Sequence, residues 1–191
     1  MRIVAGRLKG RTLKGPTGAG VRPTSDRLRE TLFNVLANRV EGARVLDGFA
    51  GTGAVGLEAL SRGAAHVTFV EHDRRALAVI RDNIRACGVA ADCDVVSADI
   101  TSLGERQPGL GRFGLVFLDP PYDALDLDRV VAGAARWVTP DGTLVLEHST
   151  RRASPERAAS LVRYRLLEAG DSALSFYVPS AAADTMDASN R

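Results

Sequence analysis

The sequence predicts an α/β fold built on one doubly wound, mostly parallel sheet of seven strands. From residue 44 onwards, short apolar stretches alternate with stretches of helical hydrophobic spacing, which is typical of a parallel sheet with helices on both faces. A glycine-rich turn follows the first of these apolar stretches. Two strand-like stretches near the C-terminus flank a Gly-Asp turn and predict an antiparallel hairpin at the sheet edge. The length of 191 residues suits a single domain with small attachments.

The individual elements follow from hydrophobic spacing and turn residues. Thr24–Asp26 offer caps for a first helix that extends to about Asn38. Further helices are expected at about Ala54–Arg62, Arg74–Ala86 and Leu125–Val138. Strands are expected at Arg44–Asp47, His66–Glu71, Cys93–Ala98, Leu115–Leu118, Thr143–Glu147 (after a Pro-Asp-Gly turn at 140–142), Arg163–Glu168 and Ala173–Val178. These elements define a core domain over residues 25–179, preceded by an arm over 1–24 and followed by a small, polar tail over 180–191 that we expect to be disordered.

Positive charge is concentrated at the N-terminus. Residues 1–44 hold ten Lys and Arg against three Asp and Glu, a net charge of +7, whereas the remainder carries −5. Several glycines interrupt the segment, so we expect a short β-hairpin and a loop that bind a polyanion such as nucleic acid. The alternative is a solvated segment that serves solubility, and helix capping is an alternative for Thr24. The candidate RNA-binding residues are Arg2, Arg7, Lys9, Arg11, Lys14, Arg22, Thr24 and Arg27.

The glycine-rich turn has the spacing G-x-G-x-x-G at Gly51, Gly53 and Gly56, which by itself is compatible with a dinucleotide. Asp47, at the end of the preceding strand, would repel a phosphate and attract a positively charged ligand. S-adenosylmethionine carries an ammonium and a sulfonium and has no phosphate. The acid before the glycines therefore favours S-adenosylmethionine over NAD.

Acidic residues recur at the ends of successive predicted strands, where ligands of open α/β sheets bind. Glu71 lies 24 positions after Asp47, near the spacing at which an acid accepts hydrogen bonds from ribose hydroxyls. Asp99 is placed to meet an adenine amino group, with helix capping as the alternative. His72 is a candidate for adenosine contact, although an ordinary loop histidine is the alternative. The candidate cofactor-binding residues are Asp47, Gly48, Phe49, Ala50, Gly51, Thr52, Gly53, Glu71, His72, Asp99 and Ile100.

The stretch Asp119, Pro120, Pro121 and Tyr122 is the predicted catalytic segment. The two prolines restrict the backbone and hold carbonyl groups in place, and the aromatic ring can stack on a base. An exocyclic base amine is a poor nucleophile because its lone pair is delocalised, and accepting its hydrogens at Asp119 and the Pro120 carbonyl would localise that pair. The alternative is an ordinary Pro-Pro turn.

Five stretches carry a family resemblance: Arg-Ile-Val-Ala-Gly-Arg-Leu-Lys-Gly-Arg (2–11), Arg-Pro-Thr-Ser-Asp-Arg-Leu-Arg-Glu-Thr-Leu-Phe-Asn (22–34), Asp-Gly-Phe-Ala-Gly-Thr-Gly (47–53), Gly-Leu-Glu-Ala-Leu-Ser-Arg-Gly-Ala (56–64) and Asp-Pro-Pro-Tyr (119–122). They resemble the RsmD family of class I S-adenosylmethionine-dependent amino-methyltransferases, over about residues 1–178. The resemblance implies a Rossmann-like fold and methylation of the 2-amino group of one guanine in bacterial small-subunit (16S) ribosomal RNA. Gly48 stands where the family commonly has leucine, which we expect to loosen the turn.

Two other functions remain open: an amino-methyltransferase acting on DNA adenine or cytosine, and an RNA-binding ribosome assembly factor. We expect a monomer that acts on ribosomal RNA within an assembling particle. Cys87 and Cys93 lack metal-ligand spacing and the three histidines are scattered, so no metal is expected. The sequence contains neither a signal peptide nor a membrane-spanning stretch, which predicts a cytoplasmic protein.

Overall fold

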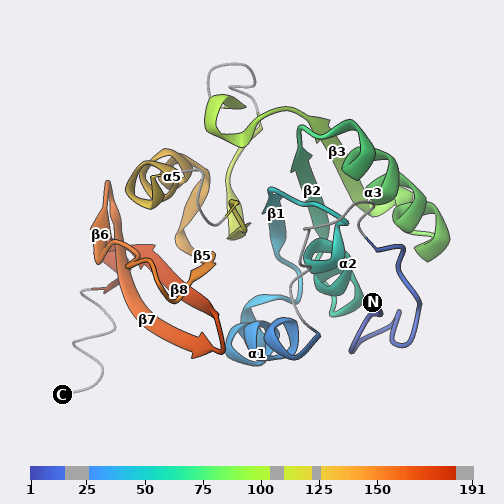
Figure 1. The fold of residues 1–191 in the computed structure, drawn as a ribbon, viewed down its shortest axis with the longest axis horizontal. Helices are drawn as coiled ribbons and strands as arrows, with labels where there is room; N and C mark the ends of the chain where they lie inside the picture. Colours follow the sequence, from blue (N-terminus) through green and yellow to red (C-terminus); the bar gives the residue numbers. More distant parts are fainter. Residues whose placement is uncertain (16–25, 104–109, 122–125, 184–191) are drawn as a thin grey trace.

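The computed structural model of the chain describes residues 1–15, 26–103, 110–121 and 126–183. Within these ranges, one sheet of eight strands with the order β3-β2-β1-β4-β5-β8-β7-β6 crosses the molecule (Figure 1). Its strands are β1 Arg44–Gly48, β2 His66–Glu71, β3 Cys93–Ser97, β4 Phe113–Leu118, β5 Val138–Ser149, β6 Arg157–Ala158, β7 Leu161–Ala169 and β8 Ser172–Pro179. Strands β1 to β5 pair in parallel, and β8, β7 and β6 add antiparallel pairs at one edge. This confirms the predicted α/β fold with its antiparallel C-terminal hairpin.

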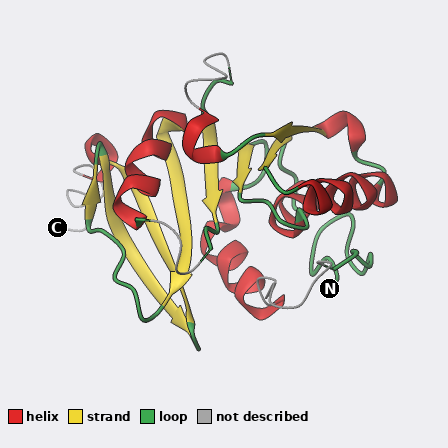
Figure 2. Cartoon of the chain, turned by 45° about the horizontal axis from the view of Figure 1, so that its top comes forward, coloured by secondary structure: helices red, strands yellow, loops and turns green. Residues whose placement is uncertain are grey.

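The helices form a layer on each side of the sheet (Figure 2). Helices α1 Asp26–Leu36, α2 Ala54–Ser61 and α3 Arg74–Cys87 contribute to one apolar core, and α5 Leu127–Ala134 to the other. Short 3₁₀ turns lie at η1 Ala37–Arg39, η2 Ala90–Asp92, η3 Ile100–Ser102 and η4 Ala135–Trp137. Successive strand residues alternate between the two cores, as the period of two in a β-strand requires. In β1, for example, Val45 packs with α1 and α2, and Leu46 packs with α5.

Four details differ from the sequence prediction. The sheet has eight strands rather than seven, because β6 adds a two-residue strand that is too short to produce a hydrophobic pattern. The predicted Pro-Asp-Gly turn lies inside β5, whose pairing with β4 shifts register between Phe113 and Leu115. The helix expected over 125–138 is α5, which ends at Ala134, and η4 continues the chain to β5. The tail over 180–191 was expected to be disordered, but residues 180–183 form a helical turn after β8, and 184–191 lie outside the described residues.

The N-terminal arm forms a minimal hairpin with one antiparallel bridge, between Arg2 and Thr12. Its apolar side chains Ile3, Leu8 and Leu13 are each at most 5% exposed and belong to the core beneath α1 and α2. The described part of the arm, residues 1–15, is therefore packed against the domain, beside α2 and α3 (Figure 1).

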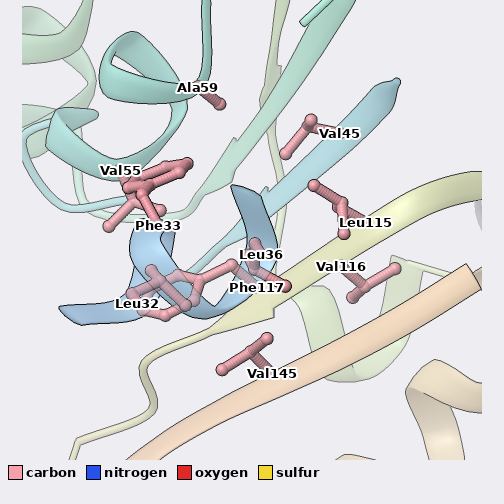
Figure 3. Close-up of a pocket in the computed structure, with 10 residues that line it drawn as sticks. All are labelled: Leu32, Phe33, Leu36, Val45, Val55, Ala59, Leu115, Val116, Phe117 and Val145. Atoms are coloured by element: carbon pink, nitrogen blue, oxygen red, sulfur yellow. The ribbon is translucent and has the colours of Figure 1, made fainter. Parts of the chain in front are cut away.

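Helix α1 covers β1, β4 and β5 closely. The space between them is a void of about 10 Å³ lined by ten apolar residues (Figure 3): Leu32, Phe33, Leu36, Val45, Val55, Ala59, Leu115, Val116, Phe117 and Val145. This void is at the lower limit for a single water molecule and is far too small for a nucleoside. A cofactor must therefore bind outside this core.

Candidate functional site

Four carboxylates lie at the ends of four adjacent strands: Asp47 on β1, Glu71 on β2, Asp119 after β4 and Glu147 on β5. Each comes two positions after a residue of the core that contains α1 and α2, namely Val45, Phe69, Phe117 and Val145. Side chains two residues apart in a strand point to the same face. The four acids therefore share one face of the sheet, at the carboxyl edge where ligands of open α/β folds bind.

Asp47 is almost fully buried, with 2% exposure. Its Oδ2 accepts a hydrogen bond of 2.9 Å from the backbone N–H of Gly56, in the first turn of α2. The pKa of Asp47 is raised from 3.8 to about 7, mainly because the carboxylate is buried. The Gly56 hydrogen bond opposes this shift, and the charge of Glu71 adds to it. A positive charge placed here by a ligand would favour the ionised form.

Glu71 organises the glycine-rich loop through both of its carboxylate oxygens. Oε2 accepts from the N–H of Gly51 at 2.9 Å, and Oε1 accepts from the N–H groups of His72 and Asp73 at 2.8 and 2.9 Å. A carboxylate has about four lone-pair sites, so roughly one acceptor site remains for a ligand hydroxyl. The His72 side chain is 65% exposed, beside this carboxylate.

The loop between β1 and α2 has the backbone geometry that its glycines allow. Gly51 and Gly53 have φ angles of 55° and 75°, in the left-handed region. Phe49 also has a positive φ, 58°, an uncommon value for a residue with a side chain that is typical of functional loops. At Gly56, a Cβ atom would lie 2.3 Å from the Phe69 ring, so only glycine lets α2 approach β2 this closely. Ala50 and Thr52 complete the loop, and the Thr52 carbonyl accepts from Asn83 at 3.0 Å.

The packing at Gly48 differs from the expectation, and Asp99 takes the capping role that was its stated alternative. A Cβ atom at Gly48 would lie 2.5 Å from Ile100 and 2.7 Å from Leu118, so these side chains occupy the space and the turn is packed rather than loosened. Asp99 accepts from the Thr101 N–H at 2.8 Å and caps η3, which is the alternative role noted for it. The contacts of Asp99 and Ile100 with a cofactor stay predictions.

Asp119 is only partly exposed at the end of β4, and its backbone N–H approaches the Gly48 carbonyl at 3.4 Å. Burial raises the pKa of Asp119 well above its usual value, and the charges of Glu147 and then Asp47 raise it further. Pro120 is buried and Pro121 is exposed, whereas Tyr122 lies outside the described residues. Glu147 was missed in the sequence analysis. The available signal was the strand Thr143–Glu147, which ends on an acid as the strands before Asp47 and Glu71 do.

The predicted RNA-binding residues that the structure describes have exposed side chains, but several of them make contacts within the protein. Arg7 pairs with Asp92 at 2.9 Å, and Lys14 pairs with Asp82 at 2.6 Å. The side chains of Arg7 and Lys14 are still 52% and 67% exposed, and such surface pairs contribute little energy, so they are exchangeable for phosphate. Arg11 donates to a backbone carbonyl of α3; Arg2, Lys9 and Arg27 are exposed; Arg22 and Thr24 lie outside the described residues.

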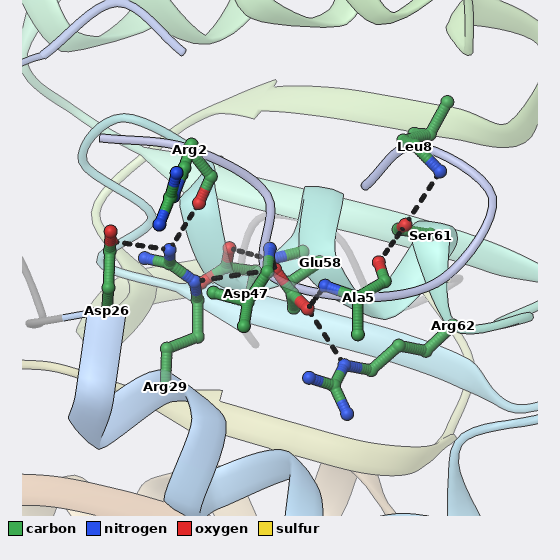
Figure 4. Close-up of polar contacts among 11 residues, drawn as sticks. Arg2, Ala5, Leu8, Asp26, Arg29, Asp47, Glu58, Ser61 and Arg62 are labelled. Atoms are coloured by element: carbon green, nitrogen blue, oxygen red, sulfur yellow. Dashed lines mark hydrogen bonds and ion pairs between the residues drawn. The ribbon is translucent and has the colours of Figure 1, made fainter. Parts of the chain in front are cut away.

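A buried ion cluster joins the arm to α1 and α2 (Figure 4). Glu58, which is fully buried, accepts from the N–H groups of Val4 and Ala5 at 2.8 and 2.9 Å and from Arg62 at 2.8 Å. Fully buried Arg29 lies 3.6 Å from the same carboxylate and donates to the Arg2 carbonyl at 2.7 Å. The sequence analysis did not predict this cluster either, because it counted Arg29 among the positive charges expected to be exposed at the N-terminus.

The residues present fit S-adenosylmethionine. The site has a positive-φ loop at a helix N-terminus, a remaining acceptor on Glu71 for a hydroxyl, and a buried acid, Asp47, whose ionised form needs a cation. A phosphate would meet four carboxylates at this edge, so a dinucleotide fits poorly. In the described ranges, no three His, Cys, Asp or Glu side chains are arranged to hold a metal ion. The helices of the same ranges are too short or too polar to span a membrane.

Comparison with known proteins identifies the relatives of this fold and site. The model of the family described as Conserved hypothetical protein 95 matches residues 1–178. The chain belongs to this family. It is 36% identical over 179 residues to Ribosomal RNA small subunit methyltransferase D of Escherichia coli, covering 93% of this chain and 89% of the relative. The protein of the same name from Haemophilus influenzae is 33% identical over 185 residues, covering 88% and 93%. These findings confirm the resemblance to the RsmD family.

A solved structure has the same fold as this chain. The structure of yhhF from Escherichia coli superposes with a TM-score of 0.81 at 34% identity, covering 94% of this chain and 97% of that one. The two chains therefore share the same overall fold.

Proposed function

We propose that this chain is a methyltransferase that uses S-adenosylmethionine to modify the 2-amino group of a guanine in small-subunit ribosomal RNA. The relatives named above are ribosomal RNA methyltransferases and are matched over most of their length. The observation that carries the proposal is that the Asp119-Pro120 segment lies beside the start of the glycine-rich loop. The backbone N–H of Asp119 donates to the carbonyl of Gly48, which precedes that loop. A target amine held at Asp119 would lie beside the loop assigned to the cofactor.

When bound, S-adenosylmethionine supplies an electrophilic methyl group. The chain has to hold the amine in line with it and localise the nitrogen lone pair. The Asp119 carboxylate and the Pro120 carbonyl each accept one amine hydrogen. Proline has no N–H of its own and a restricted φ, so its carbonyl stays in place when the amine arrives. Asp47 and Glu71 keep the loop in register with the strand ends and provide negative charge opposite the cationic cofactor.

The arm and the start of α1 bring RNA to this edge. The exposed side chains of Arg2, Lys9 and Arg27 can bind phosphates directly. Arg7 and Lys14 bind phosphates in place of their surface partners Asp92 and Asp82. Tyr122, next to the catalytic prolines in the sequence, provides a ring for stacking on the guanine. We propose that the protein acts as a monomer, in the cytoplasm, on RNA in an assembling small subunit.

The test is transfer of labelled methyl groups to four substrates: purified small ribosomal particles, naked 16S RNA, large-subunit RNA and duplex DNA. Nucleoside analysis of the product should give N2-methylguanosine from small-subunit RNA alone, with a higher yield from particles than from naked RNA. The Asp119→Ala variant, with cofactor binding retained, serves as the control for contaminating activity. Methylated adenine or cytosine in DNA would assign the alternative activity, and tight RNA binding without methyl incorporation would assign an assembly factor.

A further inference from the structure

Glu147 is a buried carboxylate at the end of β5 that the steps above do not use. It is 3% exposed and pairs across the sheet with Leu174 of β8, which belongs to the core beneath α1 and α2. Paired residues of neighbouring strands point to the same face. The Glu147 side chain therefore faces the side of the sheet on which Asp47 and Glu71 lie.

The register between β4 and β5 places Glu147 next to Asp119. Leu118 pairs with Leu146, so Asp119 and Glu147 are the next residues on the two parallel strands. Neighbouring strands are separated by about 4.8 Å, so two carboxylates that face the same side at this step lie close together. Asp119 is the more exposed of the two, and Glu147 is buried.

The electrostatics of the pair agree with its geometry. After burial, the charge of Glu147 is the largest influence that raises the pKa of Asp119, ahead of the charge of Asp47. Among the residues that the structure describes, the charged side chains buried on this face of the sheet are Asp47, Glu71, Glu147, Arg29 and Glu58. Arg29 forms ion pairs with Glu58 and Asp26. The positive charge of Arg29 is therefore paired with these carboxylates and not with Asp119 or Glu147.

We propose that Glu147 is a positioning residue for the methyl transfer proposed above, and that its carboxylate makes Asp119 the acceptor of the proton that the target amine loses. Glu147 acts only through Asp119. The inference rests on the proposed function, because it assigns the proton acceptor of that reaction.

The chemical step balances without a further reactant. A bond forms between the amine nitrogen and the methyl carbon while the bond from that carbon to sulfur breaks, and the electron pair of the broken bond stays on sulfur. The nitrogen then carries a positive charge and one proton too many. Asp119 accepts this proton and releases it to solvent at the partly exposed strand end. A more basic Asp119 accepts it more readily near neutral pH.

Three variants test the proposal. Glu147→Gln removes the charge and keeps the shape, Glu147→Asp keeps the charge on a shorter side chain, and Glu168→Gln removes a charge from the exposed part of β7 as a matched control. The rate of single-turnover methyl transfer is measured from pH 5 to 9 with saturating cofactor and RNA. We expect the acidic limb of the profile to move down by about one pH unit or more in Glu147→Gln, the effect of losing one nearby like charge. Glu147→Asp and Glu168→Gln should keep the limb of the unmodified protein.

A second measurement needs no activity. Carbon-13 NMR of labelled aspartate carboxyl groups gives the pKa of Asp119 directly, with Asp119→Asn identifying the resonance. An unchanged pKa of Asp119 in a folded Glu147→Gln protein would overturn the role of Glu147, whatever its effect on rate. If the acidic limb persists in Asp119→Asn, the proton acceptor is another group and this inference is overturned, whereas the proposed function is overturned only if the unmodified protein transfers no methyl group to small-subunit RNA. The two failures are therefore distinguishable.

Discussion

Asp47 should link cofactor binding to proton release. Its pKa in the free protein is raised from 3.8 to about 7, so ionising it in the folded protein costs about 4 kcal/mol relative to water, at ~1.36 kcal/mol for each pH unit. A cationic cofactor favours the ionised form, and its apparent affinity falls in proportion to the ionised fraction. That fraction is about one half at pH 7 and ~3% at pH 5.5, so we expect binding to weaken more than tenfold between these values.

The assay is isothermal titration calorimetry with S-adenosylmethionine at pH 5.5, 6.0, 6.5 and 7.0. This range lies below the pKa of an α-amino group, about 7.7–8.0, so the cofactor keeps its own charge. At pH 7, titrations in buffers of different ionisation enthalpy should show release of about half a proton for each cofactor bound. Asp47→Asn should bind more weakly at pH 7 and lose both the proton release and the pH dependence. Asp73→Asn, which alters an exposed acid in the same region, should retain them.

Equal affinity at pH 5.5 and 7.0 would refute the reasoning, since it would mean that the charge of Asp47 does not contribute to binding. The same pKa shift has a consequence for the free protein. The unfolded chain loses the Asp47 proton near pH 4 and the folded chain near pH 7, so stability falls as pH rises between these values and is constant above them. Asp47→Asn should therefore flatten the pH dependence of the free energy of unfolding.

Three further predictions concern the catalytic segment and the arm. The rate of single-turnover methyl transfer should be partly retained in Asp119→Asn, which keeps an acceptor oxygen, and should fall to background in Asp119→Ala. Equal rates for these two variants would contradict a role of Asp119 in holding the target amine. Chemical denaturation should show that Glu58→Gln lowers the free energy of unfolding by about 3 kcal/mol, because the buried Arg29 and the half-buried Arg62 lose a shared carboxylate and Arg29 keeps only its ion pair with Asp26; a loss below ~1 kcal/mol would contradict this. Filter binding should show RNA affinity weakened by Lys9→Ala and by salt, and unchanged affinity would count against the arm as an RNA-binding segment.

Much of the fold followed from the sequence because buried parallel strands and their connecting helices produce strong local patterns. Strand β2 has the predicted limits, and β1 differs by one residue at its end. The differences occur where tertiary pairing overrides local signals. Strand β5 continues through the Pro-Asp-Gly segment because β4 pairs with it on both sides of a register shift. The two-residue strand β6 exists only through its pairing with β7.

The site could be predicted where it depends on backbone spacing and could not where it depends on side-chain packing. The glycine loop and the acids Asp47, Glu71 and Asp119 meet at one edge because consecutive parallel strands end there. The packing of Ile100 against Gly48 joins residues that lie far apart in the sequence, so no local pattern indicates it. Glu147 joins the site only through the order of strands, which places β5 next to β4.

The charge pattern alone does not show whether the N-terminal arm and the cofactor-binding loop are structurally independent. On the basis of charge, removal of residues 1–20 should abolish RNA methylation and leave cofactor affinity nearly unchanged. Asn83, which is 1% exposed, connects the two segments: its Oδ1 accepts from the Lys14 N–H at 2.8 Å, and its Nδ2 donates to the Thr52 carbonyl of the glycine loop at 3.0 Å. Removing the arm would leave the Asn83 Oδ1 without the Lys14 donor and would expose the core side chains against which Ile3 and Leu13 pack. It would also remove the Val4 and Ala5 N–H groups that donate to Glu58. Truncation should therefore weaken cofactor binding together with RNA binding, whereas substitution of exposed arm charges should affect RNA binding alone.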